Sequence, residues 1–91
     1  MGTPRILRSV LEHLERGDWN AAHEIVQKDE ESALFCWAHG IVHLMEGDVP
    51  NARYWYRVAK RPFPKNPSVP EEIAAFSSAL EPDRKSGARA R

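Results

Sequence analysis

Two histidines four positions apart are the residues whose spacing points most directly to chemistry. His39 and His43 stand in a stretch with helical periodicity. On a helix this spacing places both imidazoles on one face, as for two ligands of a zinc ion. Glu46 continues the same stripe, and His23 or Asp29 is positioned to supply a third ligand. The pattern predicts a candidate site for zinc or another divalent transition metal on His23, His39 and His43.

Such a site would be open to water, and metal-assisted hydrolysis would follow from it. The chain lacks the glutamate next to the first histidine that zinc-protease helices carry. This metal site is the alternative to an interpretation that needs no cofactor, in which His39 and His43 are core or boundary histidines, hydrogen-bonded to Tyr54, Tyr56 or backbone carbonyls.

The single cysteine, Cys36, cannot form a disulfide within the chain. Because it lies in an apolar run, we interpret it as a small core residue. A nucleophilic role would need a base nearby, and His39 lies one helical turn away.

Three consecutive aromatic residues, 54–56, stand between two arginines. On a helix they cannot all face inward, so Trp55 and Tyr56 are expected in the core and Tyr54 elsewhere. Interfaces are enriched in Tyr, Trp and Arg. The predicted partner-binding residues are therefore Trp37, Arg53, Tyr54 and Arg57. The alternative is that Tyr54 packs against the proline-rich segment that follows.

The elements that carry these residues are predicted from apolar periodicity and end signals. Helices are expected over about 4–16, 19–28, 32–46, 49–60 and 69–80. Gly17 and Gly47 are expected to end helices, and Asp18 and Asp48 to begin the next ones. Ile6 and Trp19 are placed on buried stripes. Four prolines interrupt the chain between residues 62 and 70.

An internal repeat is the strongest architectural signal. Four residues recur thirty positions later: Leu14, Gly17, Asp18 and Ala22 as Leu44, Gly47, Asp48 and Ala52. Each unit thus consists of a helix, a Gly-Asp turn and a second helix. Amphipathic helices of this kind must stack on neighbours to bury their apolar stripes.

The second unit resembles the tetratricopeptide repeat over residues 32–64. The matching positions are Gly40, Gly47, Asp48, Ala52, Tyr56, Ala59 and Pro64. The first unit matches only at Gly17, Asp18 and Ala22. The chain departs from the family pattern at Cys36, His39 and His43, where larger apolar or aromatic residues are usual. Residues 37–56 also look like a group of short bacterial proteins without an assigned activity.

The resemblance implies an all-α fold of two stacked antiparallel helix-turn-helix units, with a short C-terminal helix capping them. We expect one domain over residues 1–80 and a mobile basic tail over 81–91. Members of this family usually bind peptides or proteins in a groove made by three or more repeats. With two repeats, the resemblance implies a small scaffold that binds a protein partner or forms a homodimer.

Composition and charge restrict the function further. Residues 1–52 carry four Lys/Arg and nine Asp/Glu, whereas residues 53–91 carry nine and four. This asymmetry suits an acidic partner or self-association with opposite ends facing. A chain neutral overall argues against nucleic acid. No apolar run is long enough for a membrane span, and a cytoplasmic location is expected. The chain shows no phosphate loop and no Ser-His-Asp order, which favours a protein that is not an enzyme.

Overall fold

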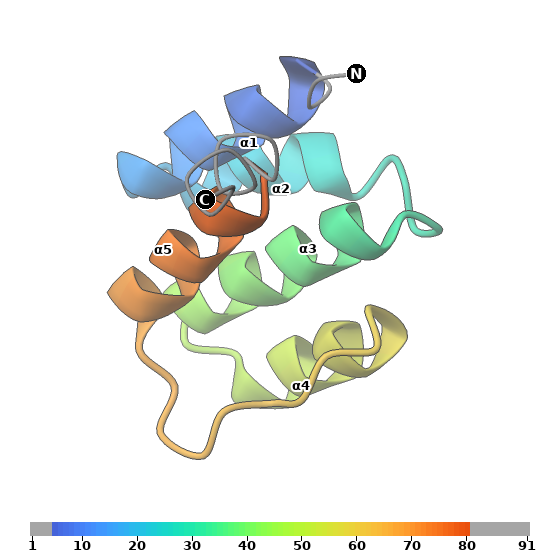
Figure 1. Cartoon of the computed structure of the whole chain (residues 1–91), viewed down its shortest axis with the longest axis vertical. Coiled ribbons are helices and arrows are strands. Elements are labelled where there is room, and N and C mark those ends of the chain that lie inside the picture. Colours follow the sequence, from blue (N-terminus) through green and yellow to red (C-terminus); the bar gives the residue numbers. More distant parts are fainter. Residues whose placement is uncertain (1–4, 81–91) are drawn as a thin grey trace, which may run out of the picture.

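The structure is a computed structural model that describes residues 5–80, and within them it is all-helical, as predicted (Figure 1). The helices are α1 (Arg5–Glu15), α2 (Trp19–Val26), α3 (Ala33–Met45), α4 (Val49–Val58) and α5 (Val69–Ala79). They lie within a few residues of the expected ranges. The predicted tail over 81–91 lies outside the described residues.

The two Gly-Asp turns have the same backbone geometry. Gly17 adopts a φ of 78° and Gly47 a φ of 84°, the left-handed region that glycine enters without steric cost. The Gly17 amide donates to the Leu14 carbonyl at 3.0 Å, and the Asp18 amide donates to the His13 carbonyl at 2.9 Å. Equivalent bonds at 3.1 and 2.8 Å close the turn at Gly47. This pattern satisfies carbonyls at a helix end and reverses the chain.

Each following helix begins with a side-chain cap. The Asp18 carboxylate accepts from the third amide beyond it at 3.3 Å, and Asp48 does the same at 3.4 Å. Ser32 and Ser68 cap α3 and α5 in the same way, both at 3.4 Å. These bonds satisfy amides that lack partners within the helix, so the recurring aspartate of the repeat has a local physical cause.

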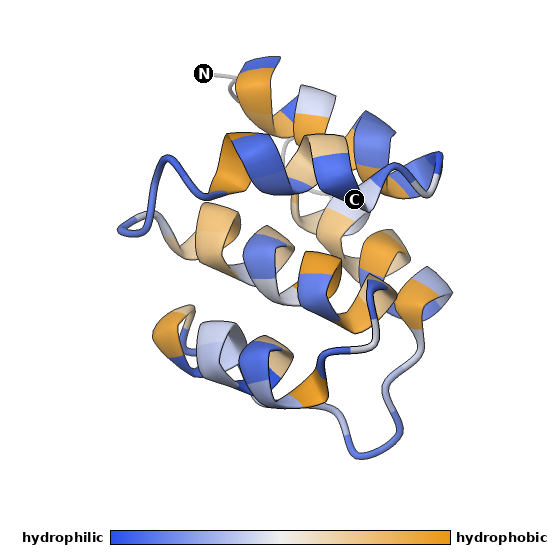
Figure 2. Ribbon diagram, turned by 180° about the vertical axis from the view of Figure 1, so that it is seen from behind, coloured by the Kyte–Doolittle hydropathy of each residue, from blue (hydrophilic) through white to orange (hydrophobic). Residues whose placement is uncertain are grey.

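Helix α3 lies at the centre of the molecule. All nine residues from Phe35 to His43 are buried. The α1–α2 hairpin packs on one side of α3 and α4 on the other, while α5 lies across α1 and α3 (Figure 1). Seen from behind, hydrophilic stretches interrupt the hydrophobic surface of α3 where it lies between α2 and α4 (Figure 2).

Helices α3 and α4 approach each other closely at Gly40. A β-carbon at this position would lie 2.5 Å from the Cδ1 atom of Tyr56 and 3.3 Å from the Ala52 carbonyl oxygen. Only the absence of a side chain allows this contact, and Ala52 is itself fully buried. The close approach brings residues from the two helices into direct ring contact.

Helix α5 is held by aromatic packing and one polar contact. Phe76 is buried and packs edge-on against Trp37, with ring centroids 5.2 Å apart. The Tyr56 hydroxyl donates to the Glu72 carboxylate at 2.5 Å, which links α4 to α5. Burial, followed by this hydrogen bond, raises the pKa of Tyr56.

Two residues expected on buried stripes lie at the surface instead. Ile6 is 48% exposed and Trp19 is 37% exposed. Both are in the first turn of their helices, and no described helix covers them fully. None of the described helices combines the length and apolar character needed to cross a membrane.

Candidate metal centre

The three histidines singled out in the sequence lie together where α2 crosses α3. His23 is in the middle of α2, and its ring faces the two histidines of α3. One ligand nitrogen from each of His23, His39 and His43 lies within 4.8 Å of the other two. The i, i+4 spacing aligns the pair on α3, and the packing of α2 supplies the third ring.

The rings form a compact cluster. The centroid of His23 lies 4.9 Å from that of His39 and 5.5 Å from that of His43, both edge-on. His39 and His43 are stacked at 5.1 Å with 22° between their planes. His39 and His43 are buried and His23 is half-buried, so the cluster opens toward solvent on the α2 side.

Trp55 of α4 closes the opposite side of the cluster. Its ring stacks on His39 with centroids 4.0 Å apart and an angle of 8°. This leaves His39 only 4% exposed. Its Nδ1 atom is buried and has no hydrogen-bond partner within the described part of the chain. A buried imidazole nitrogen without a partner is unfavourable unless a proton donor, acceptor or metal ion satisfies it.

Electrostatics keep His39 neutral. Desolvation, followed by the neighbouring His23 and His43, lowers the pKa of His39 to about 4. At neutral pH the ring therefore carries one free nitrogen lone pair. Only neutral imidazole can bind a metal ion, so this environment prepares His39 as a ligand.

Glu46 orients His43 within the cluster. The Nδ1 atom of His43 lies 3.0 Å from the Oε1 atom of Glu46. A carboxylate accepts here, so Nδ1 carries the proton and Nε2 remains free as a ligand atom. Metal-binding histidines commonly donate their other nitrogen to a carboxylate in this way, which fixes the ring and raises its basicity.

The dimensions fit one transition-metal ion after a small adjustment. Zinc–nitrogen bonds of about 2.0–2.1 Å place two tetrahedral ligands roughly 3.4 Å apart. The nitrogens lie within 4.8 Å of one another, so each pair needs to close by at most about 1.4 Å, which side-chain rotation of the half-buried His23 can supply. Three nitrogen ligands leave a fourth position for water.

Asp29 and Cys36, the other candidate functional residues of the sequence, form hydrogen bonds with the backbone outside the histidine cluster. The Asp29 carboxylate accepts the backbone amides of Glu31 and Ser32 at 3.0 and 3.1 Å, so it shapes the turn before α3 and is outside the cluster. The Cys36 thiol donates to the Glu30 carbonyl at 3.3 Å, and burial raises the pKa of Cys36. Activation of a thiol needs a lowered pKa, so the surroundings of Cys36 give no support to a nucleophilic role.

The hydrogen bonds proposed for core histidines are also absent from the described residues. Tyr56 donates to Glu72 rather than to a histidine, and the 48% exposed Tyr54 contacts Trp55 edge-on. Phe63, from the proline-rich segment, packs on Tyr56 rather than on Tyr54. The exposure of Tyr54 fits a partner-binding role.

The other predicted partner-binding residues are divided between surface and core. Arg53 and Arg57 are exposed on α4. Trp37 is 1% exposed, because Phe76 packs against it and the Arg61 guanidinium lies 3.4 Å from its ring centroid. Trp37 therefore lies in the core, whereas Tyr54 is the exposed aromatic residue of the predicted set.

Sequence reasoning missed the role of Trp55, although a signal was present. His39 lies eight positions before Gly47, and Trp55 lies eight positions after Gly47. In an antiparallel hairpin, residues at equal distances from the turn lie beside each other, so this symmetry indicates the His39–Trp55 contact.

The chain itself provides all of this geometry, and comparison with known proteins adds nothing to it. No protein-family model matches the sequence, no curated protein matches it, and no solved structure matches its fold.

Proposed function

We propose that this protein binds one divalent transition-metal ion, with zinc the first candidate, through His23, His39 and His43. The observation that carries the proposal is the convergence of three imidazoles from two helices. The unpartnered nitrogen of His39 and the carboxylate on His43 support it. Imidazole ligands favour zinc, copper, nickel and iron over magnesium and calcium.

The proposal is for binding rather than hydrolysis. A hydrolytic site needs a general base beside the metal-bound water. Glu46, the carboxylate that contacts the cluster, is hydrogen-bonded to His43. A metal held between α2 and α3 would tie the two helical hairpins together, which gives the ion a structural role.

The test uses protein purified without a histidine tag. Metal analysis after dialysis against zinc should give one ion per chain, and titration of the metal-free protein with Co²⁺ should produce the visible absorption of a tetrahedral site. Titration with Cu²⁺ should quench Trp55 fluorescence, since that ring stacks on His39.

The fourth histidine of the chain provides a matched control. His39→Ala should abolish stoichiometric binding, whereas His13→Ala, on α1 and outside the cluster, should leave it unchanged. A metal content well below one ion per chain, or equal binding by both variants, would refute the proposal.

A second candidate is a tetratricopeptide-like scaffold that binds a protein partner or a second copy of itself. The close packing of Gly40 against Tyr56 and Ala52 supports the resemblance to that repeat. Helix α4 packs on α3 and is joined to α5 by the Tyr56–Glu72 hydrogen bond, while Tyr54 and Val58 on its outer side are 48% and 37% exposed. The opposite charges of the two halves support self-association.

Light scattering tests the scaffold hypothesis. If the outer face of α4 mediates self-association, the measured mass should rise with protein concentration. Tyr54→Ser should then remain monomeric at the same concentrations. A mass equal to that of one chain at every concentration would rule out self-association, and the scaffold hypothesis would then require a different protein as the partner.

A further inference from the structure

Beyond the histidine cluster, the most unusual feature of the molecule is a pocket lined by three arginines. The pocket has a volume of about 260 Å³. Its walls come from the end of α4 and the segment after it: Arg53, Tyr56, Arg57, Arg61 and Phe63. It shares no residue with the histidine cluster, so the two sites can be tested independently.

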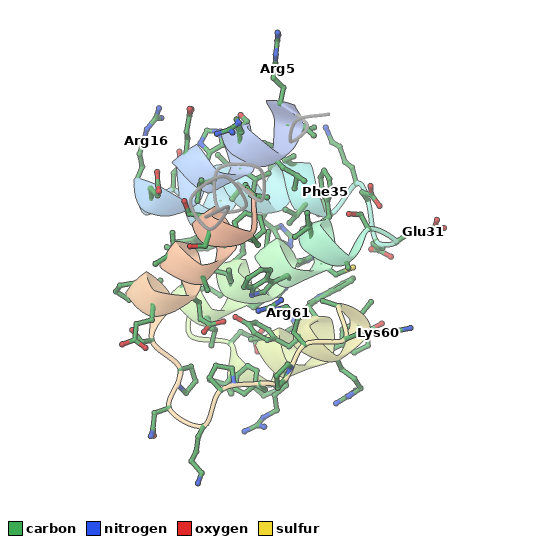
Figure 3. All side chains as sticks on the ribbon, viewed as in Figure 1. Arg5, Arg16, Glu31, Phe35, Lys60 and Arg61 are labelled. Carbon is green, nitrogen blue, oxygen red and sulfur yellow. The ribbon has the colours of Figure 1, made fainter. Side chains whose placement is uncertain are left out.

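The backbone at the end of α4 brings the three guanidinium groups together. Arg53 and Arg57 are four positions apart and lie on one face of the helix. Lys60 adopts a left-handed φ of 61° and ends the helix, which turns Arg61 back toward it. Figure 3 shows the Arg61 side chain directed across the molecule, whereas Arg5, Arg16 and Lys60 extend away from it.

Aromatic rings hold two of the arginines in place. The Arg61 guanidinium lies 3.4 Å from the Trp37 ring centroid, and that of Arg53 lies 4.7 Å from the Phe63 centroid. Such cation–π contacts orient a guanidinium but do not neutralise its charge. The hydrogen-bonding edges of both groups therefore remain available to a ligand.

No carboxylate forms an ion pair with these three arginines within the described residues. The ion pairs found in residues 5–80 involve only histidines. The sequence contains no acidic residue between Val49 and Pro70, and the nearby Glu72 carboxylate is bound by the Tyr56 hydroxyl. Three like charges around one pocket repel each other, and an anion would relieve that repulsion.

We propose that this pocket binds a small molecule carrying a phosphate monoester. Guanidinium groups match the oxygen geometry of phosphate, and three of them suit a dianion better than a single carboxylate. Tyr56 and Phe63 add aromatic walls on which a planar group can pack. The volume of about 260 Å³ admits a phosphate with a small organic group.

The test is a titration of the ¹⁵N-labelled protein, in the presence of EDTA, with phenyl phosphate and separately with inorganic phosphate. We expect amide shifts confined to residues around Arg53–Phe63. Arg57→Gln should weaken phenyl phosphate binding about tenfold, the loss typical of one charge-assisted contact. Arg57 makes no contact with an aromatic ring or carboxylate among the described residues, so this variant should fold normally. Arg16→Gln, an exposed arginine on another turn, is the control.

Three further comparisons decide the proposal. Benzoate should bind at least tenfold more weakly than phenyl phosphate if a dianion is required. Phenyl phosphate binding should weaken as pH falls below about 6, where the phosphate gains a proton. Equal binding by wild type and Arg57→Gln, equal binding of benzoate, or tighter binding of a single-stranded oligonucleotide would each overturn the proposal.

Discussion

At the scale of single residues, the histidine cluster depends on how each ring is supported rather than on the histidines alone. Trp55 covers His39 and Glu46 orients His43, while His23 is the most accessible of the three. The supporting residues determine which nitrogen is free and whether the ring is neutral. Substituting them therefore tests the site without removing a ligand.

Replacing Glu46 with glutamine should weaken metal binding about 10- to 100-fold, the usual cost of losing a supporting carboxylate. The amide keeps the shape but no longer accepts the His43 proton with a full negative charge. Competition with a chelator of known affinity measures the change. Glu12→Gln, an exposed glutamate on α1, should have no effect.

Metal-free protein should lose stability in acid because of His39. Its pKa is about 4 in the folded chain and 6.5 in the unfolded chain, so the unfolded state binds more protons between these values. The contribution of His39 to the unfolding free energy is therefore fully present above pH 6.5. It is lost as pH falls toward 4, and the total loss is roughly 3 kcal/mol.

Urea unfolding of wild type and His39→Leu across this range checks the expectation. Carboxylates contribute equally to both proteins, so the unfolding free energy of wild type should rise by roughly 3 kcal/mol more than that of His39→Leu as pH rises from 4 to 6.5. Parallel curves would show that His39 does not titrate differently on folding.

At the scale of helices, the structure depends on backbone positions that end one helix and admit the next. Gly17, Gly47 and Lys60 all take left-handed conformations at helix ends. The third differs in carrying a side chain, and its amide and that of Arg61 make the same two bonds as the glycine turns, both at 3.0 Å. The backbone conformation at helix ends and the close contact between helices therefore contribute separately to the unfolding free energy, and each contribution can be tested by substitution.

Lys60→Gly should stabilise the protein by about 1 kcal/mol, because glycine enters this conformation without the steric cost that lysine has. Thermal unfolding measures the effect. Lys65→Gly, outside any helix, is the control for loss of a lysine charge. A lower Tm for Lys60→Gly would contradict the argument.

Gly40→Ala should destabilise the protein by about 1–3 kcal/mol, although alanine is the better helix former. The added methyl group would overlap the Tyr56 ring and force α3 and α4 apart. In a Tyr56→Leu background the same substitution should cost less, since the ring is gone. Equal costs in both backgrounds would place the strain elsewhere.

At the scale of the whole molecule, a bound metal would join the two hairpins. His23 belongs to the α1–α2 hairpin, and His39 and His43 belong to α3 of the second. A chain of 91 residues buries limited apolar surface, so an added link between hairpins has a large relative effect.

Zinc at a hundred times its dissociation constant should stabilise the fold by about 2.7 kcal/mol. For a domain of this size, Tm should rise by roughly 10–20 °C. EDTA should reverse the increase, and His39→Ala should show none. A zinc-dependent increase that survives in His39→Ala would locate the metal at another site.

The sequence alone determined the helices, their ends and the alignment of His39 with His43. These features depend on interactions within a few residues: a left-handed glycine, an aspartate cap, and the fixed rise of the helix. The repeat of Gly17 and Asp18 as Gly47 and Asp48 made the hairpins predictable for the same reason.

Only the tertiary structure decided which residues meet across helices. The packing of helix faces places His23 beside the α3 histidines, stacks Trp55 on His39 and buries Trp37. Periodicity states which faces are apolar but leaves their partners and rotations open. Those are fixed by contacts between helices, such as that of the Gly40 backbone with the Tyr56 ring, which no local pattern encodes.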